Sequence, residues 1–272
     1  MSANNTEFNE EKKFKHSLVD QLKNSVILEA TILQQAHIGQ EAGISAIIAM
    51  ADHYNTNMSS LPDPDVFARY IDAVALPIIG CVRPGHVVEA FVLESFNIDC
   101  IEESENMDPF IEDGILDKRQ FVTPLMCGAD TLTAAMIHIH RGAALIRVPS
   151  QSSPIENIAE KVYGILKGIR DLKNNSESEL LEMANDVNIP LELIMEIRDK
   201  GRLPVPMFAG GNIETPADAA CFMECGCDGI ILSSSTTKVY DPVQRIAALV
   251  KAVNNYKNVD LIAEMMLQYE YM

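Results

Sequence analysis

The feature that most constrains the fold is an alternation between short, continuous apolar runs and longer amphipathic segments. Eight such runs can be counted: Val26–Leu28, Ile44–Met50, Pro77–Val82, Ile98–Ile101, Leu125–Cys127, Ala144–Val148, Val205–Phe208 and Gly229–Leu232. Continuous apolar runs are typical of parallel strands that are buried on both faces. Strands that alternate with helical segments form right-handed βαβ units. Eight units in a chain of 272 residues therefore predict an α/β protein that is a single (βα)8 barrel.

The segments between the runs carry helical signals. Pro64–Val74 has apolar residues at helical spacing, and Thr215-Pro216 is typical of an N-cap followed by the first helical residue. The long stretch 155–200 predicts two or three helices before the seventh strand. No linker divides the chain, so we expect a polar, flexible N-terminus over residues 1–12 and one barrel domain over residues 13–272.

The composition disfavours several classes of function. A formal net charge of −18 argues against nucleic-acid binding and against docking on anionic lipid. The sequence shows no apolar leader and no long apolar run, so it predicts a cytoplasmic protein without a membrane partner. Its six cysteines are scattered, which favours free thiols. Cys225-Gly-Cys227 has no matching second pair, and we expect no metal there.

Barrel geometry indicates where chemistry would be found, because such folds place it on the loops at the carboxyl ends of the strands. The residues at the ends of the eight runs are Glu29; Met50; Cys81 with Arg83; Glu102, Glu103 and Glu105; Cys127 and Gly128; Arg147 with Pro149; Gly210-Gly211-Asn212; and Ser233-Ser234-Ser235. This set is rich in carboxylates and contains no lysine. It therefore lacks the amine that imine chemistry requires.

Several motifs carry a resemblance to a known family. They are Pro77–Ala90, Glu102–Glu105, Asp117–Phe121, Gly142–Arg147, Gly201–Val205 and Thr215–Ala220. In order and spacing they resemble the synthase subunit of pyridoxal 5′-phosphate synthase, the PdxS/SNZ family, across roughly residues 12 to 265. The resemblance implies a (βα)8 barrel and a lyase activity. That activity joins a pentose phosphate, a triose phosphate and ammonia from a separate glutaminase subunit.

The main departures from the family concern its catalytic lysines. The resemblance implies that two lysines hold the substrate covalently, and their positions are here Cys81 and Pro149. A thiol can add to a carbonyl but cannot form an imine, and proline has no functional side chain. Lys238, beyond the eighth run, is the nearest substitute. The sequence leaves open whether Lys238 acts and whether Cys81 is reactive.

The family's other site positions are changed as well. Glu29 and Glu102 stand where the family has aspartate, and each lengthens the acidic arm by one methylene. A displacement of about 1 Å can cost about a hundredfold in rate. The expected phosphate loops retain Gly210-Gly211 and carry Ser233-Ser234-Ser235 in place of the family's Gly-Ser-Gly, so we predict a weakened phosphate site at Gly210, Gly211, Ser233 and Ser234. The family's paired arginines correspond to Ile137-His138.

Four other family positions are retained: Arg83, His86, Glu89 and Arg147. For His86 and Glu89 we favour a structural role on the helix after the third strand, such as capping. Arg147 can equally pair with a barrel carboxylate or bind a ligand. Asp117–Phe121 is interpreted as a loop that enters the fifth strand and makes structural or subunit contacts.

The sequence therefore predicts a non-catalytic homologue, or pseudoenzyme, of the synthase subunit, with no cofactor and no metal. We expect it to assemble into hexamers or dodecamers, either with itself or with a catalytic, lysine-bearing paralogue in vitamin B6 biosynthesis. A glutaminase partner is a weaker expectation, because Asn24-Ser25 replaces the family's Gly-Gly beside the docking helix. One alternative is an active synthase or a repurposed barrel enzyme for a phosphorylated sugar. The other is a stand-alone homo-oligomeric sensor of a ligand or protein.

Overall fold

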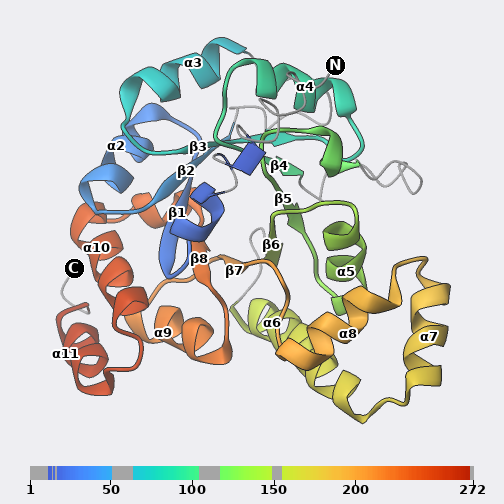
Figure 1. The fold of residues 1–272 in the computed structure, drawn as a ribbon. Helices are drawn as coiled ribbons and strands as arrows, with labels where there is room; N and C mark the ends of the chain where they lie inside the picture. Colours follow the sequence, from blue (N-terminus) through green and yellow to red (C-terminus); the bar gives the residue numbers. More distant parts are fainter. Residues whose placement is uncertain are drawn as a thin grey trace.

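Eight parallel strands form a closed barrel in chain order (Figure 1). The computed structural model describes residues 12, 13, 15, 17–50, 64–103, 117–148 and 155–269. The strands are β1 (Ser25–Ala30), β2 (Ala46–Ala49), β3 (Ile78–Val82), β4 (Cys100–Glu103), β5 (Leu125–Gly128), β6 (Leu145–Val148), β7 (Met207–Gly211) and β8 (Gly229–Leu232). Each predicted apolar run overlaps one strand. The prediction of a single (βα)8 barrel is confirmed.

Helices surround the barrel (Figure 1). The α-helices are α2 (Leu33–Glu41), α3 (Pro64–Ala73), α4 (Val87–Ser95), α5 (Leu132–His140), α6 (Ile155–Asp171), α7 (Glu177–Asp186), α8 (Leu191–Lys200), α9 (Pro216–Cys225), α10 (Pro242–Asn254) and α11 (Val259–Tyr269). Short 3-10 helices are η2 (Lys118–Gln120), η3 (Leu172–Asn174) and η4 (Ser234–Thr237). The stretch 155–200 holds α6, α7 and α8, as predicted.

The predicted N-cap of α9 is confirmed in detail. The Thr215 hydroxyl accepts a hydrogen bond from the Asp218 backbone N–H at 3.1 Å. The Asp218 carboxylate in turn accepts from the backbone N–H and hydroxyl of Thr215. Such a reciprocal cap satisfies N–H groups that the first turn leaves without partners, and the capping residue contributes about 1 kcal/mol.

Two apolar layers hold the barrel together. Successive side chains of a strand point to opposite faces of the sheet. One layer fills the barrel interior and includes Ile27, Ile48, Ile79, Met126 and Phe208. The other lies between strands and helices and includes Leu28, Ile47, Ile101, Ile146 and Ile230. The alternation also determines which side of the barrel each polar side chain faces.

The seventh strand differs from its prediction. β7 begins at Met207, two residues later than the predicted run, and extends through Gly210 and Gly211, which were expected in a loop. The residue before it is Pro206, which has no backbone N–H to donate to a ladder. Gly211 pairs in register with Leu232 of β8. The two glycines are therefore ladder residues of the barrel wall.

Some expectations fall on residues outside the described part of the chain. Pro149 and Glu105 are among these. The division into a flexible segment 1–12 and a barrel domain 13–272 stays a prediction. In the described part of the chain, no helix combines the length and apolar character needed to cross a membrane.

Candidate functional site

Four polar side chains meet inside the carboxyl end of the barrel. Glu29, Cys81, Glu102 and Arg147 come from β1, β3, β4 and β6, and we call them the interior group. They share the inward face with apolar residues two positions earlier, such as Ile79 before Cys81. The structure thus brings together four of the sequence-predicted site residues from distant parts of the chain.

Arg147 connects the two acids of the interior group. One terminal nitrogen of its guanidinium donates to Glu102 Oε1 at 2.6 Å, and the other donates to Glu29 Oε1. Arg147 is only 4% exposed, and both acids are buried. Burial acts to lower the pKa of Arg147, but the two carboxylates outweigh it and raise that pKa above its usual value. Of the two roles left open for Arg147, the structure shows the pairing with barrel carboxylates.

Cys81 completes the interior group as a protonated thiol. Its Sγ donates to Glu102 Oε2 at 3.5 Å. Burial raises the pKa of this thiol well above its usual value, and the negative charge of Glu102 raises it further. Because the thiolate is the nucleophilic form, Cys81 is a weak nucleophile in this setting. By formal charge, two carboxylates share one guanidinium, so the interior group has one acid more than it has bases.

Gly210 leaves the space that Arg147 occupies. A Cβ atom at this position would lie 2.8 Å from Arg147 Nε and 3.5 Å from its Cγ and Cζ. Within the described residues, Arg147 Nε has no hydrogen-bond partner. The close approach explains why a glycine is needed here: the strand backbone forms the wall against which the guanidinium lies.

A second polar cluster lies on the other side of the barrel wall. Glu103, Lys118, Cys127 and His138, which we call the outer group, come from β4, η2, β5 and α5 and are all buried. Glu103 Oε2 accepts from Lys118 Nζ at 2.6 Å and from Cys127 Sγ at 3.9 Å. Its other oxygen accepts from the backbone N–H of Gly85 at 3.0 Å. This carboxylate therefore ties the β3–α4 connection to β5 and η2.

Three members of the outer group have metal-binding atoms close together. Glu103, Cys127 and His138 each offer one ligand atom, and these atoms lie within 4.8 Å of one another. The Lys118 ammonium already contacts the carboxylate and supplies its positive charge. A divalent cation would have to displace that ammonium, so the contacts favour a structural ion pair.

The retained positions after β3 form a structural link. Glu89, on α4, accepts from the backbone N–H of Arg83 at 2.9 Å and from Arg83 Nε at 2.6 Å. His86 is the N-cap residue of α4, and its Nδ1 lies 3.8 Å from Glu89 Oε1. These contacts hold the start of α4 against the end of β3. The His86 side chain makes no capping hydrogen bond at the start of α4.

The predicted phosphate positions are largely committed to internal contacts. Gly210 and Gly211 belong to the β7 ladder. Ser233 caps η4, and its Oγ accepts from the backbone N–H of Ser235 at 3.4 Å. The carbonyl oxygen of Ser234 accepts from Gln35 Nε2 and Thr237 Oγ1. These internal contacts leave no ring of free N–H groups, of the kind that cradles phosphate, among the described residues at these four positions.

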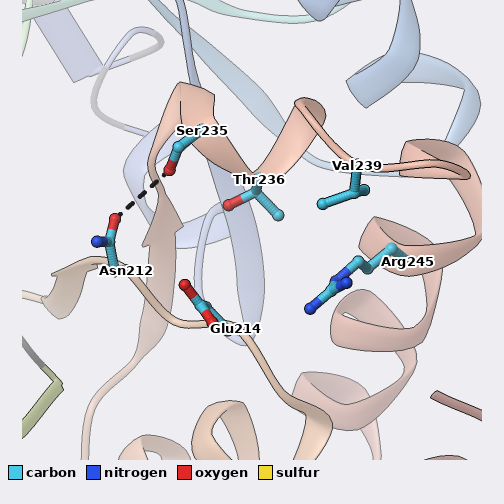
Figure 2. Close-up of a pocket in the computed structure, with 6 residues that line it drawn as sticks. All are labelled: Asn212, Glu214, Ser235, Thr236, Val239 and Arg245. Atoms are coloured by element: carbon cyan, nitrogen blue, oxygen red, sulfur yellow. Dashed lines mark hydrogen bonds between the residues drawn. The ribbon is translucent and has the colours of Figure 1, made fainter. Parts of the chain in front are cut away.

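A polar cavity of about 150 Å³ opens beside these residues, at the ends of β7 and β8. Figure 2 shows the side chains that line it: Asn212, Glu214, Ser235, Thr236, Val239 and Arg245. Glu214 and Arg245 were not singled out from the sequence. The available signal was their position in the segments that follow the seventh and eighth strands. Lys238, the nearest candidate for a substitute amine, is exposed and is not among the lining residues.

Comparison with known proteins gives consistent matches over most of the chain. The sequence model of the SOR/SNZ family matches residues 11–210, and the model of thiazole biosynthesis protein ThiG matches residues 187–269. A pyridoxal 5′-phosphate synthase subunit PdxS from Corynebacterium urealyticum is 39% identical over 93% of this chain and 85% of its own. The PdxS proteins of Desulfovibrio desulfuricans and Bifidobacterium longum are 38% and 36% identical, over 93% and 97% of this chain and 88% and 91% of theirs.

Solved structures with low sequence identity share the fold. Thiamine phosphate pyrophosphorylase from Pyrococcus furiosus aligns with a TM-score of 0.52 at 16% identity, covering 85% of this chain and 95% of that one. The BexX/CysO complex of Amycolatopsis orientalis gives a TM-score of 0.51 at 14% identity, covering 91% of each chain. At these identities the likeness concerns the barrel alone.

Proposed function

The chain belongs to the SOR/SNZ family, and from this premise we propose that it acts in vitamin B6 biosynthesis as a non-catalytic homologue of the synthase subunit PdxS. Relatives named PdxS that match more than nine-tenths of the chain support the pathway. The proposal that the protein is non-catalytic rests on its own site residues.

The observation that carries the proposal is the thiol of Cys81 within the interior group. Family chemistry requires an unprotonated amine at this position, and here a protonated thiol donates to Glu102. No lysine belongs to the interior group, which consists of Glu29, Cys81, Glu102 and Arg147. Arg147 occupies the space between the two acids. These contacts stabilise a packed barrel end without supplying a group for imine formation.

The proposed role is that of a structural or regulatory subunit. A chain that keeps the family's barrel while losing its nucleophiles can still assemble with a lysine-bearing paralogue and alter that paralogue's stability or output. We propose that the chain assembles into hexamers or dodecamers, with itself or with the paralogue, and that it contacts a glutaminase subunit. All six cysteines are free, which fits a cytoplasmic location.

A Schiff-base trapping experiment tests the loss of catalysis. The purified protein is incubated with ribose 5-phosphate, reduced with borohydride and weighed intact by mass spectrometry, beside a lysine-bearing PdxS. We expect an adduct on the lysine-bearing protein and none on this chain. An adduct that maps to a lysine, Lys238 included, would contradict the proposal.

Two further measurements sharpen the test. A Cys81→Lys variant restores an amine beside Glu102. It tests whether the missing nucleophile or the altered phosphate contacts account for the absence of an adduct. Co-expression with the lysine-bearing paralogue, followed by native mass spectrometry, is expected to give mixed rings. Rings containing only one kind of chain would argue for a stand-alone protein.

A further inference from the structure

The polar cavity at the ends of β7 and β8 is separate from the interior group, since the two share no residue. It is bounded by the β7–α9 connection, by η4 and by the first turns of α10 (Figure 2). Pockets for drug-sized ligands have volumes of about 300–1,000 Å³. At about 150 Å³, this cavity suits a smaller molecule.

Two opposite charges face this cavity from different elements. Glu214 projects from the loop after β7, and Arg245 projects from α10 toward the same space (Figure 2). In the part of the chain that the structure describes, the Glu214 carboxylate has no hydrogen bond or ion pair. The terminal nitrogens of Arg245 have none there either, since only its Nε is engaged. Both groups can therefore bind a ligand.

The Arg245 side chain is held in position by the last described helix. Its Nε donates to the Tyr269 hydroxyl at 2.8 Å, and its guanidinium lies 4.5 Å from the centre of the Tyr269 ring. The Tyr269 hydroxyl donates to the backbone oxygen of Glu214. Tyr269 thus links the two sides of the cavity. An arginine that is fixed before binding loses less side-chain entropy when a ligand arrives.

Neutral polar groups complete the lining. Asn212 Oδ1 accepts from Ser235 Oγ at 3.5 Å, which orients the amide between β7 and η4. Thr236 contributes a hydroxyl from a buried position. Because amide and hydroxyl groups both donate and accept, they can bind either end of a polar ligand. The charged pair therefore determines the class of ligand.

We propose that this cavity binds a small zwitterion of the α-amino acid class, with its carboxylate on Arg245 and its ammonium on Glu214. A phosphate dianion would be repelled by Glu214, and a simple amine would be repelled by Arg245. A neutral polyol would leave both charges without a counter-charge. A zwitterion satisfies both, and the binding does not depend on whether the protein is catalytic.

Calorimetric titration with four probes tests the proposal: L-alanine, propionate, L-alaninamide and inorganic phosphate. Propionate lacks the ammonium and alaninamide lacks the carboxylate. We expect L-alanine to bind with a Kd of about 1 mM, as for a small ligand with few contacts. Each of the other probes should bind at least about tenfold more weakly, because each loses a charge-assisted contact or is repelled.

Variants test whether Arg245 binds the carboxylate of the ligand and Glu214 binds its ammonium. Arg245→Gln should weaken L-alanine binding about tenfold or more. Glu214→Gln should weaken L-alanine similarly and bring propionate to equal or tighter binding. Tyr269→Phe keeps the ring but removes the hydroxyl, and should weaken L-alanine about threefold to tenfold. The matched control is Arg170→Gln on α6, an arginine 5.2 Å from the Tyr163 ring and outside the cavity, which should change nothing.

Three results would overturn the proposal. Absence of L-alanine binding at up to about 100 mM would exclude a site of the expected affinity. Tighter binding of phosphate than of L-alanine would identify an anion site. An unchanged L-alanine affinity in Glu214→Gln, or an equal loss in Arg170→Gln, would place the binding elsewhere. The Schiff-base experiment reports on a different residue set, so failure of one hypothesis leaves the other intact.

Discussion

Glu102 and Glu103 are neighbours on β4, yet the barrel wall separates their side chains. Glu102 points inward and shares Arg147 with Glu29, so two acids compete for one base. Glu103 points outward and pairs with Lys118, with two further donors from Gly85 and Cys127. In the outer group both carboxylate oxygens are hydrogen-bonded and one acid meets one base, whereas in the interior group two acids meet one base.

The difference separates two kinds of buried charge. The outer group joins structural elements, whereas the interior group lies where the family resemblance places a catalytic amine. A buried ion pair with complete hydrogen bonding fixes the positions of the elements it joins. A buried group with unequal charge stabilises the fold less well, and such imbalance is found where a ligand or catalytic group acts. The interior group is where the family resemblance places an amine, and Cys81 cannot supply its positive charge.

The largest expected effect is the loss of Arg147. An Arg147→Met variant leaves Glu29 and Glu102 buried without a counter-charge. Breaking a buried ion pair costs about 3–5 kcal/mol, and we expect the free energy of unfolding to fall by about 5 kcal/mol here because two acids lose their partner. Denaturant titration measures the change. A loss below about 1 kcal/mol would mean that the interior acids are stabilised by water or cations instead, and would remove the contrast between the two groups.

A smaller loss is expected on the outer side. Lys118→Met should cost about 3 kcal/mol, because Glu103 keeps the N–H of Gly85 and the thiol of Cys127 after the ammonium is lost. The matched control is Lys200→Met, which breaks an exposed pair with Glu196 on α8 and should cost only about 0.3–0.5 kcal/mol. If both variants lost equal stability, burial of the Lys118 pair would have no special effect.

The smallest effect concerns the reactivity of Cys81. Its raised pKa means that thiolate forms only at higher pH than usual, so alkylation by iodoacetamide should be slow and should rise with pH. Glu102→Gln removes one cause of that shift and should accelerate alkylation about threefold to tenfold at a given pH. Peptide mass spectrometry measures the rate.

Cys227 provides the internal control for that experiment. Burial also raises the pKa of this thiol, with smaller contributions from neighbours that do not include Glu102. Its rate should not change in Glu102→Gln. Equal acceleration of both thiols would indicate a general loosening of the barrel rather than a local electrostatic effect.

The sequence predicted the barrel because hydrophobic patterning follows burial, and every residue of the eight strands except the half-buried Cys81 is buried. It also placed Glu29, Cys81, Glu102 and Arg147 at one end, since parallel strands end on the same side of a barrel. The start of β7 was predicted two residues early, because Val205 is apolar but Pro206 cannot join the ladder.

The partners of individual charges could not be predicted in the same way. Lys118 precedes β5 in the sequence, and only the packing of η2 against the barrel brings its Nζ to Glu103. The cavity charges, Glu214 and Arg245, depend on how α10 and α11 pack together through Tyr269. Such contacts depend on the relative placement of helices, which a local pattern of apolar residues does not encode.

The missing side chain at Gly210 makes the residues that positions 210 and 147 can accept depend on each other. While Arg147 is present, any larger residue at 210 would collide with its guanidinium. Once a shorter side chain replaces Arg147, the collision disappears and position 210 can accept alanine or serine. An alanine at position 210 would therefore force the Arg147 guanidinium out of its place between the two acids, whereas a shorter side chain at position 147 would leave room for it.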